Sequence, residues 1–318
     1  MDEFALIDRF FANRGPVRAD VRLGIGDDAA VTRVEAGSEL VIATDTLVEG
    51  THFLPGTAPR ALGYRCLAVN LSDLAAMGAE PLWCTLALTL PDGAEDWVGS
   101  FSEGFMELAE RFDIALIGGD TVRGPLAMTV TVHGRVDPGC AICRDGARAG
   151  DGIFVTGSFG AAAAGLASLE SGDTGARTID RFLYPTPRID EGRSLVGIAS
   201  AMIDVSDGLH VDLARLLDAS GLGAKLAVET LPLPAELPAG VEHHRAVELA
   251  LTGGDDYELC FTVPANCSEA LERTASGWDC AVTRIGETVT ESGLAWTAAG
   301  ENFPLPDTGF RHFGEDVE

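Results

Sequence analysis

The sequence contains almost no lysine. Lys225 is the only one among 22 Lys and Arg residues, and leucine follows it. A Walker A phosphate-binding loop needs lysine followed by serine or threonine, so this chain has none. The His-Arg-Asp and Asp-Phe-Gly motifs of protein kinases are also absent. Any phosphate chemistry must therefore use metal ions, arginines and backbone N–H groups.

Positive charge as a whole is scarce. The chain has 49 acidic residues, a formal net charge of −27 and no basic run, which argues against nucleic acid or anionic membranes as partners. No stretch approaches the roughly 18 apolar residues of a membrane helix. The N-terminus, MDEFALIDRF, is acidic where a secretory signal is basic. We expect a soluble, cytoplasmic protein with no membrane partner.

The cysteine and histidine patterns exclude two further kinds of site. Seven scattered cysteines, an odd number, suit a reducing compartment. Cys140 and Cys143 form a single CxxC pair with no second pair and no flanking histidine, which disfavours zinc binding or redox use. None of the six histidines lies in an HExxH motif.

The length of 318 residues and the apolar pattern predict two α/β domains. In the first we expect a helix near the N-terminus, a helix over 60–77 with a single apolar stripe, and a helix capped by Asp92. We expect strands over 39–44, 82–90, 114–117 and 126–136. The last strand has an outer face of threonines and His133 that suits either solvent or a second subunit. A run rich in Gly, Asp, Arg and Pro over 137–151 places the boundary, giving domains 1–148 and 149–318.

The second domain begins with a strand over 153–156 and a glycine turn into an alanine-rich helix. The N-terminus of this helix would suit an anion, although close helix packing explains the alanines equally well.

Acidic residues recur where solvated acids are uncommon. Gly118 and Gly119 follow an apolar run, leave room for a ligand or another backbone, and precede Asp120. Six places in all put aspartate at a glycine turn, a strand end or an apolar helix face: Asp27/Asp28, Asp45, Asp73, Asp120, Asp204/Asp207 and Asp255/Asp256. Two carboxylates in contact repel by roughly 3–4 kcal/mol at an effective dielectric near 20.

If these acids converge, cations must come from outside, because the chain has one lysine. All-oxygen clusters favour Mg²⁺, which usually binds together with substrate phosphates. The residues thus predict a magnesium-dependent site for a phosphorylated substrate. The alternative is that the acids only decorate the surface.

Six motifs, in order, closely resemble thiamine-monophosphate kinases of the aminoimidazole-ribonucleotide-synthetase-like superfamily. They are GIGDDAAV (24–31), ATDTLVEGTHF (43–53), AVNLSDLAAMGAEP (68–81), IGGDTVRGP (117–125), IDVSDGL (203–209) and GGDDYELCFTV (253–263). The resemblance implies ATP-dependent phosphorylation of thiamine phosphate to thiamine diphosphate. It also implies an N-terminal mixed or antiparallel sheet with helices that forms a homodimer interface, and a C-terminal α/β sandwich.

The same resemblance assigns the site residues. The Mg²⁺ ligands would be Asp28, Thr44, Asp45, Asp73, Asp120, Asp204 and Asp207. ATP would contact Gly119, Asp120, Arg144 and Ser206, and thiamine phosphate would contact His52, Asp255 and Phe310. Several Mg²⁺ ions are implied, and a need for K⁺ stays open.

The expected chemistry needs no catalytic base, because the attacking phosphate oxygen is already ionised; catalysis reduces to charge neutralisation and in-line positioning. An acid and an aromatic face suit the cationic thiazolium ring. Three positions depart from the family pattern: Ala43 replaces a hydroxyl residue, Asp255 a glutamate, and Phe310 a tyrosine or tryptophan. The first puts one metal contact in doubt and the others the pose of thiamine.

Two alternatives remain at this stage. One is another ATP-using synthetase of the superfamily, making selenophosphate or activating an amide; a selenophosphate synthetase usually carries a reactive Cys and a Lys near its N-terminus, and neither occurs before residue 60. The other is a non-catalytic protein that binds divalent ions, although no EF-hand loop is present.

Overall fold

The computed structural model describes residues 3–12, 14–237 and 241–303. Phe310 lies outside these ranges. The chain divides into two compact units, Met1–Ala141 and Ile142–Glu318. The division falls inside the 137–151 run in which the sequence analysis placed the boundary. No described helix is long and apolar enough to cross a membrane.

Unit 1 is built on a four-stranded mixed sheet with the strand order β3-β6-β4-β5, in which only β4 and β5 run parallel. This confirms the predicted mixed sheet. Its elements in chain order are α1 (Glu3–Phe10), β1 (Val21–Leu23), β2 (Val31–Thr32), β3 (Glu39–Val48), α2 (Pro59–Ala76), β4 (Glu80–Leu90), α3 (Glu95–Arg111), β5 (Ala115–Arg123) and β6 (Ala127–Val136).

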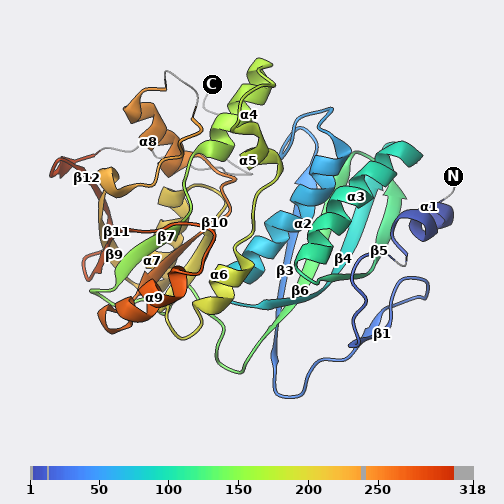
Figure 1. Ribbon diagram of the computed structural model, residues 1–318, viewed down its shortest axis with the longest axis horizontal. Helices are drawn as coiled ribbons and strands as arrows, with labels where there is room; N and C mark the ends of the chain where they lie inside the picture. The colour runs from blue at the N-terminus through green and yellow to red at the C-terminus, as the bar shows by residue number, and fades with distance from the viewer. Residues whose placement is uncertain (1–2, 13, 238–240, 304–318) are drawn as a thin grey trace. The chain divides into compact units, whose positions relative to one another are not determined.

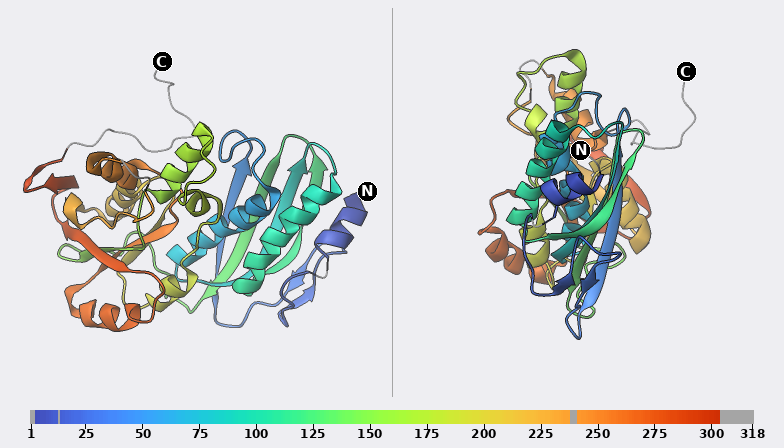
Figure 2. Two further views of the ribbon diagram at one scale, coloured as in Figure 1. Left: turned by 45° about the horizontal axis from the view of Figure 1, so that its top comes forward. Right: turned by 90° about the vertical axis from the view of Figure 1, so that its right-hand side faces the viewer.

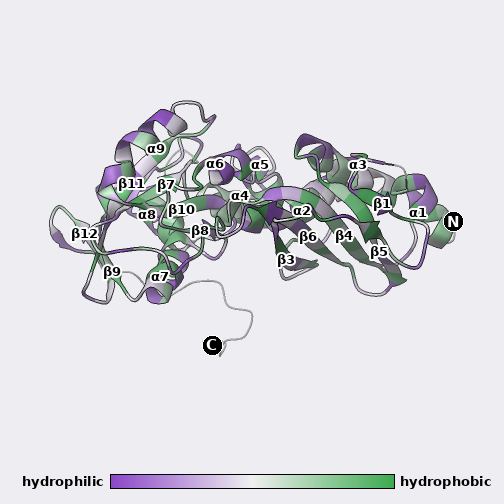
Figure 3. Cartoon of the chain, turned by 90° about the horizontal axis from the view of Figure 1, so that it is seen from below, coloured by the Kyte–Doolittle hydropathy of each residue, from purple (hydrophilic) through white to green (hydrophobic). Residues whose placement is uncertain are grey.

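Helices α2 and α3 lie side by side over one face of this sheet (Figures 1 and 2). The two helices approach closely: a Cβ atom at Gly104 of α3 would lie 1.9 Å from the carbonyl oxygen of Arg60 on α2. Helix α2 is buried around nearly its whole circumference, so the single apolar stripe expected for it is too narrow. Figure 3 shows β4 and β5 largely in the hydrophobic colour, as expected for strands beneath two helices.

Three local expectations in unit 1 are wrong. Strand β3 continues past Thr44 to Val48, and β5 continues through Gly118 to Arg123, because β6 and β4 keep pairing with them. The aspartates expected at strand ends therefore lie within strands. Asp92 does not cap α3: its carboxylate accepts a hydrogen bond from the backbone of Ala94, the N-cap residue, at 3.2 Å.

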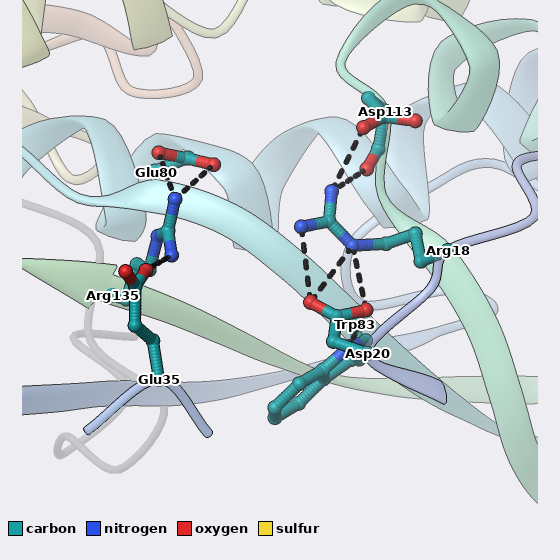
Figure 4. A network of polar contacts seen from close by, with 7 residues as sticks. All are labelled: Arg18, Asp20, Glu35, Glu80, Trp83, Asp113 and Arg135. Atoms are coloured by element: carbon teal, nitrogen blue, oxygen red, sulfur yellow. Dashed lines mark hydrogen bonds and ion pairs between the residues drawn. The ribbon is translucent and has the colours of Figure 1, made fainter. Parts of the chain in front are cut away.

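Ion pairs tie the segment before β1 to the sheet (Figure 4). Arg18 pairs with Asp20 at 3.2 Å and with Asp113 at 2.8 Å. The indole of Trp83 on β4 donates to Asp20 at 3.2 Å. Burial alone would raise the pKa of Asp20, but the hydrogen bonds from Arg18 and Trp83 outweigh it and the pKa lies below its usual value. This network positions the glycine-rich loop that follows β1.

Unit 2 contains a seven-stranded sheet with the order β13-β12-β9-β11-β7-β10-β8. All its strand pairs are antiparallel except β12 with β9. Its strands are β7 (Gly152–Thr156), β8 (Ala201–Val205), β9 (Gly223–Ala227), β10 (Glu258–Val263), β11 (Val282–Val289), β12 (Gly293–Ala298) and β13 (Glu301–Asn302).

The helices of unit 2 are α4 (Ala161–Ser171), α5 (Ile179–Leu183), α6 (Ile189–Ser194), α7 (Leu209–Ser220), α8 (His243–Thr252) and α9 (Ser268–Ala275), with short 3₁₀ turns η1 (Val228–Thr230) and η2 (Ala265–Cys267). Apolar residues of α7 and α8, such as Leu213 and Val247, form one core with strand residues such as Ile203 and Trp296. The antiparallel pairing of β8 with β10 places the end of β8 beside the start of β10.

Candidate functional site

A pocket of about 750 Å³ opens beside β5 in unit 1. Helix α1, the glycine-rich loop 24–30 and strands β4 and β5 line it. The pocket brings together two pairs that lie far apart in the sequence, Asp27/Asp28 and Gly119/Asp120. Its volume is in the range of small-molecule sites. The side chains of Asp28 and Asp120 are exposed.

The backbone at Gly119 passes very close to β4. A Cβ atom here would lie 1.9 Å from the carbonyl oxygen of Leu86, and φ is +156°. The register slips by one residue just before this point, leaving Ile117 as an extra residue in β5. Such bulges re-aim neighbouring side chains. The expectation that the two glycines admit another backbone is confirmed at Gly119; that backbone is β4.

A second group of predicted residues gathers at the opposite edge of the sheet, on β3. The buried Asn70 of α2 accepts a hydrogen bond from the backbone N–H of Asp45 at 2.8 Å and donates to the Cys66 carbonyl at 2.8 Å. Asp73 lies one turn further along the same side of α2. The ring nitrogen Nδ1 of His52 accepts from the backbone of Val48 at 3.0 Å.

Thr44 lies on the other face of β3 from Asp45, since neighbouring strand residues point to opposite faces. Its hydroxyl donates to Thr131 at 2.9 Å across the β3–β6 pair, and Thr46 forms the same contact with Thr129 at 2.8 Å. The register puts Asp120 level with Thr46 on this face. Thr44 and Asp120 thus point to the same face of the sheet, but Thr44 lies on the edge strand β3 and Asp120 on the opposite edge strand β5.

The predicted metal ligands of unit 1 therefore form two groups, one at each edge of the sheet. Three strand spacings separate β3 from β5, about 14 Å. Across residues 3–12, 14–237 and 241–303, no three His, Cys, Asp or Glu side chains come close enough together to hold a metal ion.

In unit 2, the end of β8 and the start of α7 form a compact acidic turn. Asp212 accepts hydrogen bonds from the backbones of Ser206 and Asp207 at 3.0 and 2.9 Å. Arg215 contacts Asp207 at 2.6 Å and Asp212 at 2.7 Å. Burial, and then the charge of Asp207, raise the pKa of Asp212 despite these donors. Asp204 is buried in β8.

Asp212 is not among the residues predicted from the sequence. A local pattern could have indicated it: Asp212 is an acid in the first turn of α7, and this helix begins directly after Gly208. A carboxylate in that position can accept hydrogen bonds from nearby backbone N–H groups. Arg144, a predicted ATP contact, is exposed, and its carbonyl accepts from Ser220 at 2.8 Å.

The GGDDYE segment joins this turn. The backbone N–H of Asp255 donates to the Ser206 carbonyl at 2.8 Å, so two predicted ligand contacts lie side by side. Asp256 points elsewhere: its carboxylate accepts from the backbones of Gly160 at 2.8 Å and Ala162 at 3.5 Å, at the start of α4. The helix N-terminus expected to suit an external anion is thus occupied by the protein's own Asp256 carboxyl group. Burial raises the pKa of Asp256 to about 8.

A buried ion pair next to this segment was also missed. Glu258 forms two hydrogen bonds of 2.6 Å with Arg188 and one of 2.8 Å with Thr156, and Arg181 approaches it at 3.2 Å. Glu258 and its partners are distant in sequence, so no local sequence pattern predicts their contact.

Matches to known protein families show the class of protein to which the chain belongs. Two family models, AIR synthase related protein, N-terminal domain and C-terminal domain, match residues 26–136 and 148–297. The thiamine-monophosphate kinase of Escherichia coli K12 is 46% identical over 318 residues, with 98% of each chain covered.

Solved structures agree with this class. A crystal structure of thiamine-monophosphate kinase from Stenotrophomonas maltophilia K279a superposes with a TM-score of 0.87 at 44% identity, covering 95% of this chain and 98% of that one. "AaThiL complexed with AMPPCP and TMP" gives 0.77 at 32% identity over 91% and 92%. The chain belongs to the thiamine-monophosphate kinase family, and the resemblance drawn from the six motifs is confirmed.

Proposed function

We propose that the protein transfers the γ-phosphoryl group of ATP directly to the phosphate of thiamine phosphate, giving ADP and thiamine diphosphate. The observation that carries this proposal is the near-complete match to thiamine-monophosphate kinases, including a structure described as bound to AMPPCP and TMP. The pocket beside β5 supports it, because exposed carboxylates and a glycine backbone line a space of nucleotide size.

The residues available fit Mg²⁺ chemically. The candidates offer carboxylate and hydroxyl oxygens, the donors that this ion prefers, and Lys225 is the only lysine of the chain. We propose Asp28, Thr44, Asp45, Asp73, Asp120, Asp204 and Asp207 as its ligands. When bound, the ions neutralise charge on the phosphates. A K⁺ requirement would be revealed by the same assay described below.

We propose that Gly119, Asp120, Arg144 and Ser206 bind ATP, and that His52 and Asp255 bind thiamine phosphate, with Phe310 as a third contact. The Arg144 guanidinium can form paired hydrogen bonds with phosphate oxygens. No side chain is needed as a base, because the accepting phosphate oxygen is ionised at neutral pH.

A homodimer would bring the two separated groups of predicted metal ligands of unit 1 into one site. Asp45 and Asp73 lie at the β3 edge and Asp28 and Asp120 at the β5 edge of one sheet, too far apart to share one ion. We propose that two copies associate through these sheets, so that the β5 edge of one copy completes the β3 edge of the other. Exposed apolar side chains on the threonine-bearing face support this: Ile42 is 57% exposed and Val122 47%.

The deciding assay measures ADP and thiamine diphosphate by chromatography after incubation with ATP, Mg²⁺ and thiamine phosphate, with an EDTA control. We expect equal amounts of both products, formed only with metal. ATP turnover without thiamine diphosphate would instead favour another ATP-using synthetase of the superfamily. No turnover, together with a melting temperature that ATP and Mg²⁺ raise no more than Mg²⁺ alone, would favour an ion-binding protein.

We place the protein in the cytoplasm, where ATP is available. All seven cysteines are free thiols, which is consistent with a reducing compartment.

A further inference from the structure

The short loop between α8 and β10 is held in an unusual backbone conformation. Asp255 has φ = +70° and Tyr257 has φ = +50°, so two non-glycine residues on either side of Asp256 adopt left-handed values. Aspartate tolerates this region, but for a bulky residue such as tyrosine it is a genuine outlier. Such strain persists only where surrounding contacts enforce it, and it concentrates at functional sites.

Contacts on both sides of Asp255 enforce this conformation. The backbone N–H groups of Asp255 and Tyr257 donate to the carbonyls of Ser206 and Val205 at 2.8 Å each. Between them, the buried carboxylate of Asp256 accepts from the backbone of Gly160 at the start of α4. The loop is therefore fixed to β8 on one side and to α4 on the other.

The side chain of the strained Tyr257 contacts the side chain of Asp255. The Tyr257 hydroxyl donates a hydrogen bond to Oδ1 of Asp255 at 3.1 Å, and Tyr257 is only 7% exposed. Its buried ring fixes where the hydroxyl points. The hydroxyl is a neutral donor, and its hydrogen bond favours the carboxylate orientations that keep Oδ1 beside it.

We propose that Tyr257 is a positioning residue that orients the carboxylate of Asp255 toward the cationic ring of thiamine phosphate, with Asp256 anchoring the loop on α4. The inference rests on the proposed function, which makes Asp255 a substrate contact. Without the tyrosine, that carboxylate would lose the hydroxyl that holds Oδ1. The positioned acid instead presents a fixed charge to the ring, which strengthens its attraction for a cation.

The test is the Tyr257→Phe variant, which removes one hydroxyl and keeps the ring. We expect the KM for thiamine phosphate to rise about five-fold, the loss of one hydrogen bond, while kcat and the KM for ATP stay within about two-fold of wild type. Tyr64→Phe removes a hydroxyl from α2 instead and should change neither KM. Melting curves of both variants verify folding.

A double-mutant cycle with Asp255→Asn makes the test specific. If Tyr257 acts through Asp255, adding Tyr257→Phe to Asp255→Asn changes the KM for thiamine phosphate no further. Independent, multiplying effects would overturn the inference, as would equal rises in both KM values or an unchanged KM in Tyr257→Phe. A wild-type protein that makes no thiamine diphosphate would refute the proposed function itself, which the wild-type assay shows separately.

Discussion

The placement of carboxylates at opposite edges of one sheet leads to a sharp prediction about mixed dimers. Asp73 lies on α2 beside the β3 edge, and Asp120 lies on β5, three strands away. If each active site combines the β3 edge of one copy with the β5 edge of the other, Asp73→Asn and Asp120→Asn each destroy both sites of a homodimer. A heterodimer of the two variants behaves differently.

In that heterodimer, both substitutions fall in one site and the other site is wholly native. We therefore expect two inactive homodimers and a heterodimer with about half of the wild-type kcat, because a two-fold dimer has two equivalent sites. The variants are co-expressed with different affinity tags, the heterodimer is purified through both tags, and thiamine diphosphate formation is measured. Asparagine matches aspartate in size, so the exposed or half-buried sites should keep their folds.

A matched control uses two residues of the same edge. In a heterodimer of Asp45→Asn and Asp73→Asn, each site retains one substitution, and we expect no recovery. An Asp73→Asn/Asp120→Asn heterodimer as inactive as its parents would refute the shared-site reasoning. Inactivity of both heterodimers would show that all these ligands of a site come from a single chain, and recovery of the Asp45→Asn/Asp73→Asn heterodimer would show that Asp45 and Asp73 do not serve the same site.

Three further predictions concern stability and nucleotide binding. Asn70→Leu removes the acceptor of the Asp45 backbone N–H and should lower the free energy of unfolding by about 2–3 kcal/mol in urea titrations; a change below about 0.5 kcal/mol would contradict this role of Asn70. Gly119→Ala forces a Cβ atom against the Leu86 carbonyl and should abolish nucleotide binding. Gly277→Ala, whose Cβ atom would lie 3.7 Å from the nearest atom, should not; thermal shift with ATP and Mg²⁺ compares the two. Asp256 keeps its proton to about pH 8 when folded but loses it near pH 4 when unfolded, so the wild-type free energy of unfolding should fall by about 1.4 kcal/mol per pH unit between these values. The Asp256→Asn variant should flatten that slope, and parallel curves of the two proteins in denaturant titrations at pH 5–8 would disprove it.

Local patterns were enough to predict from the sequence which residues could carry the chemistry. Aspartates beside glycines and inside apolar segments pointed to a site because solvated acids rarely occupy such positions. The scarcity of lysine turned the argument toward metal ions, and the order of six motifs identified the family. The mixed sheet and the two-domain organisation followed from apolar periodicity and from that resemblance.

The ends of elements did not follow in the same way. Strand β5 continues through Gly118 because β4 supplies pairing partners, and no residue of the IGGDTVRGP motif encodes the position of β4. The anion site expected at α4 had its occupant 96 residues away, in Asp256. Long-range contacts of this kind leave no periodic trace in a sequence.

The sequence alone determined which residues are available for the reaction: carboxylates, hydroxyls and arginines in a chain with a single lysine. Only the tertiary structure decided where they lie. The strand order places Asp45 and Asp120 at opposite edges of the sheet, and the two-residue period of β3 points Thr44 and Asp45 to opposite faces of it. Side-chain chemistry is a property of each residue, whereas its neighbours depend on pairing between segments that the chain brings together only on folding.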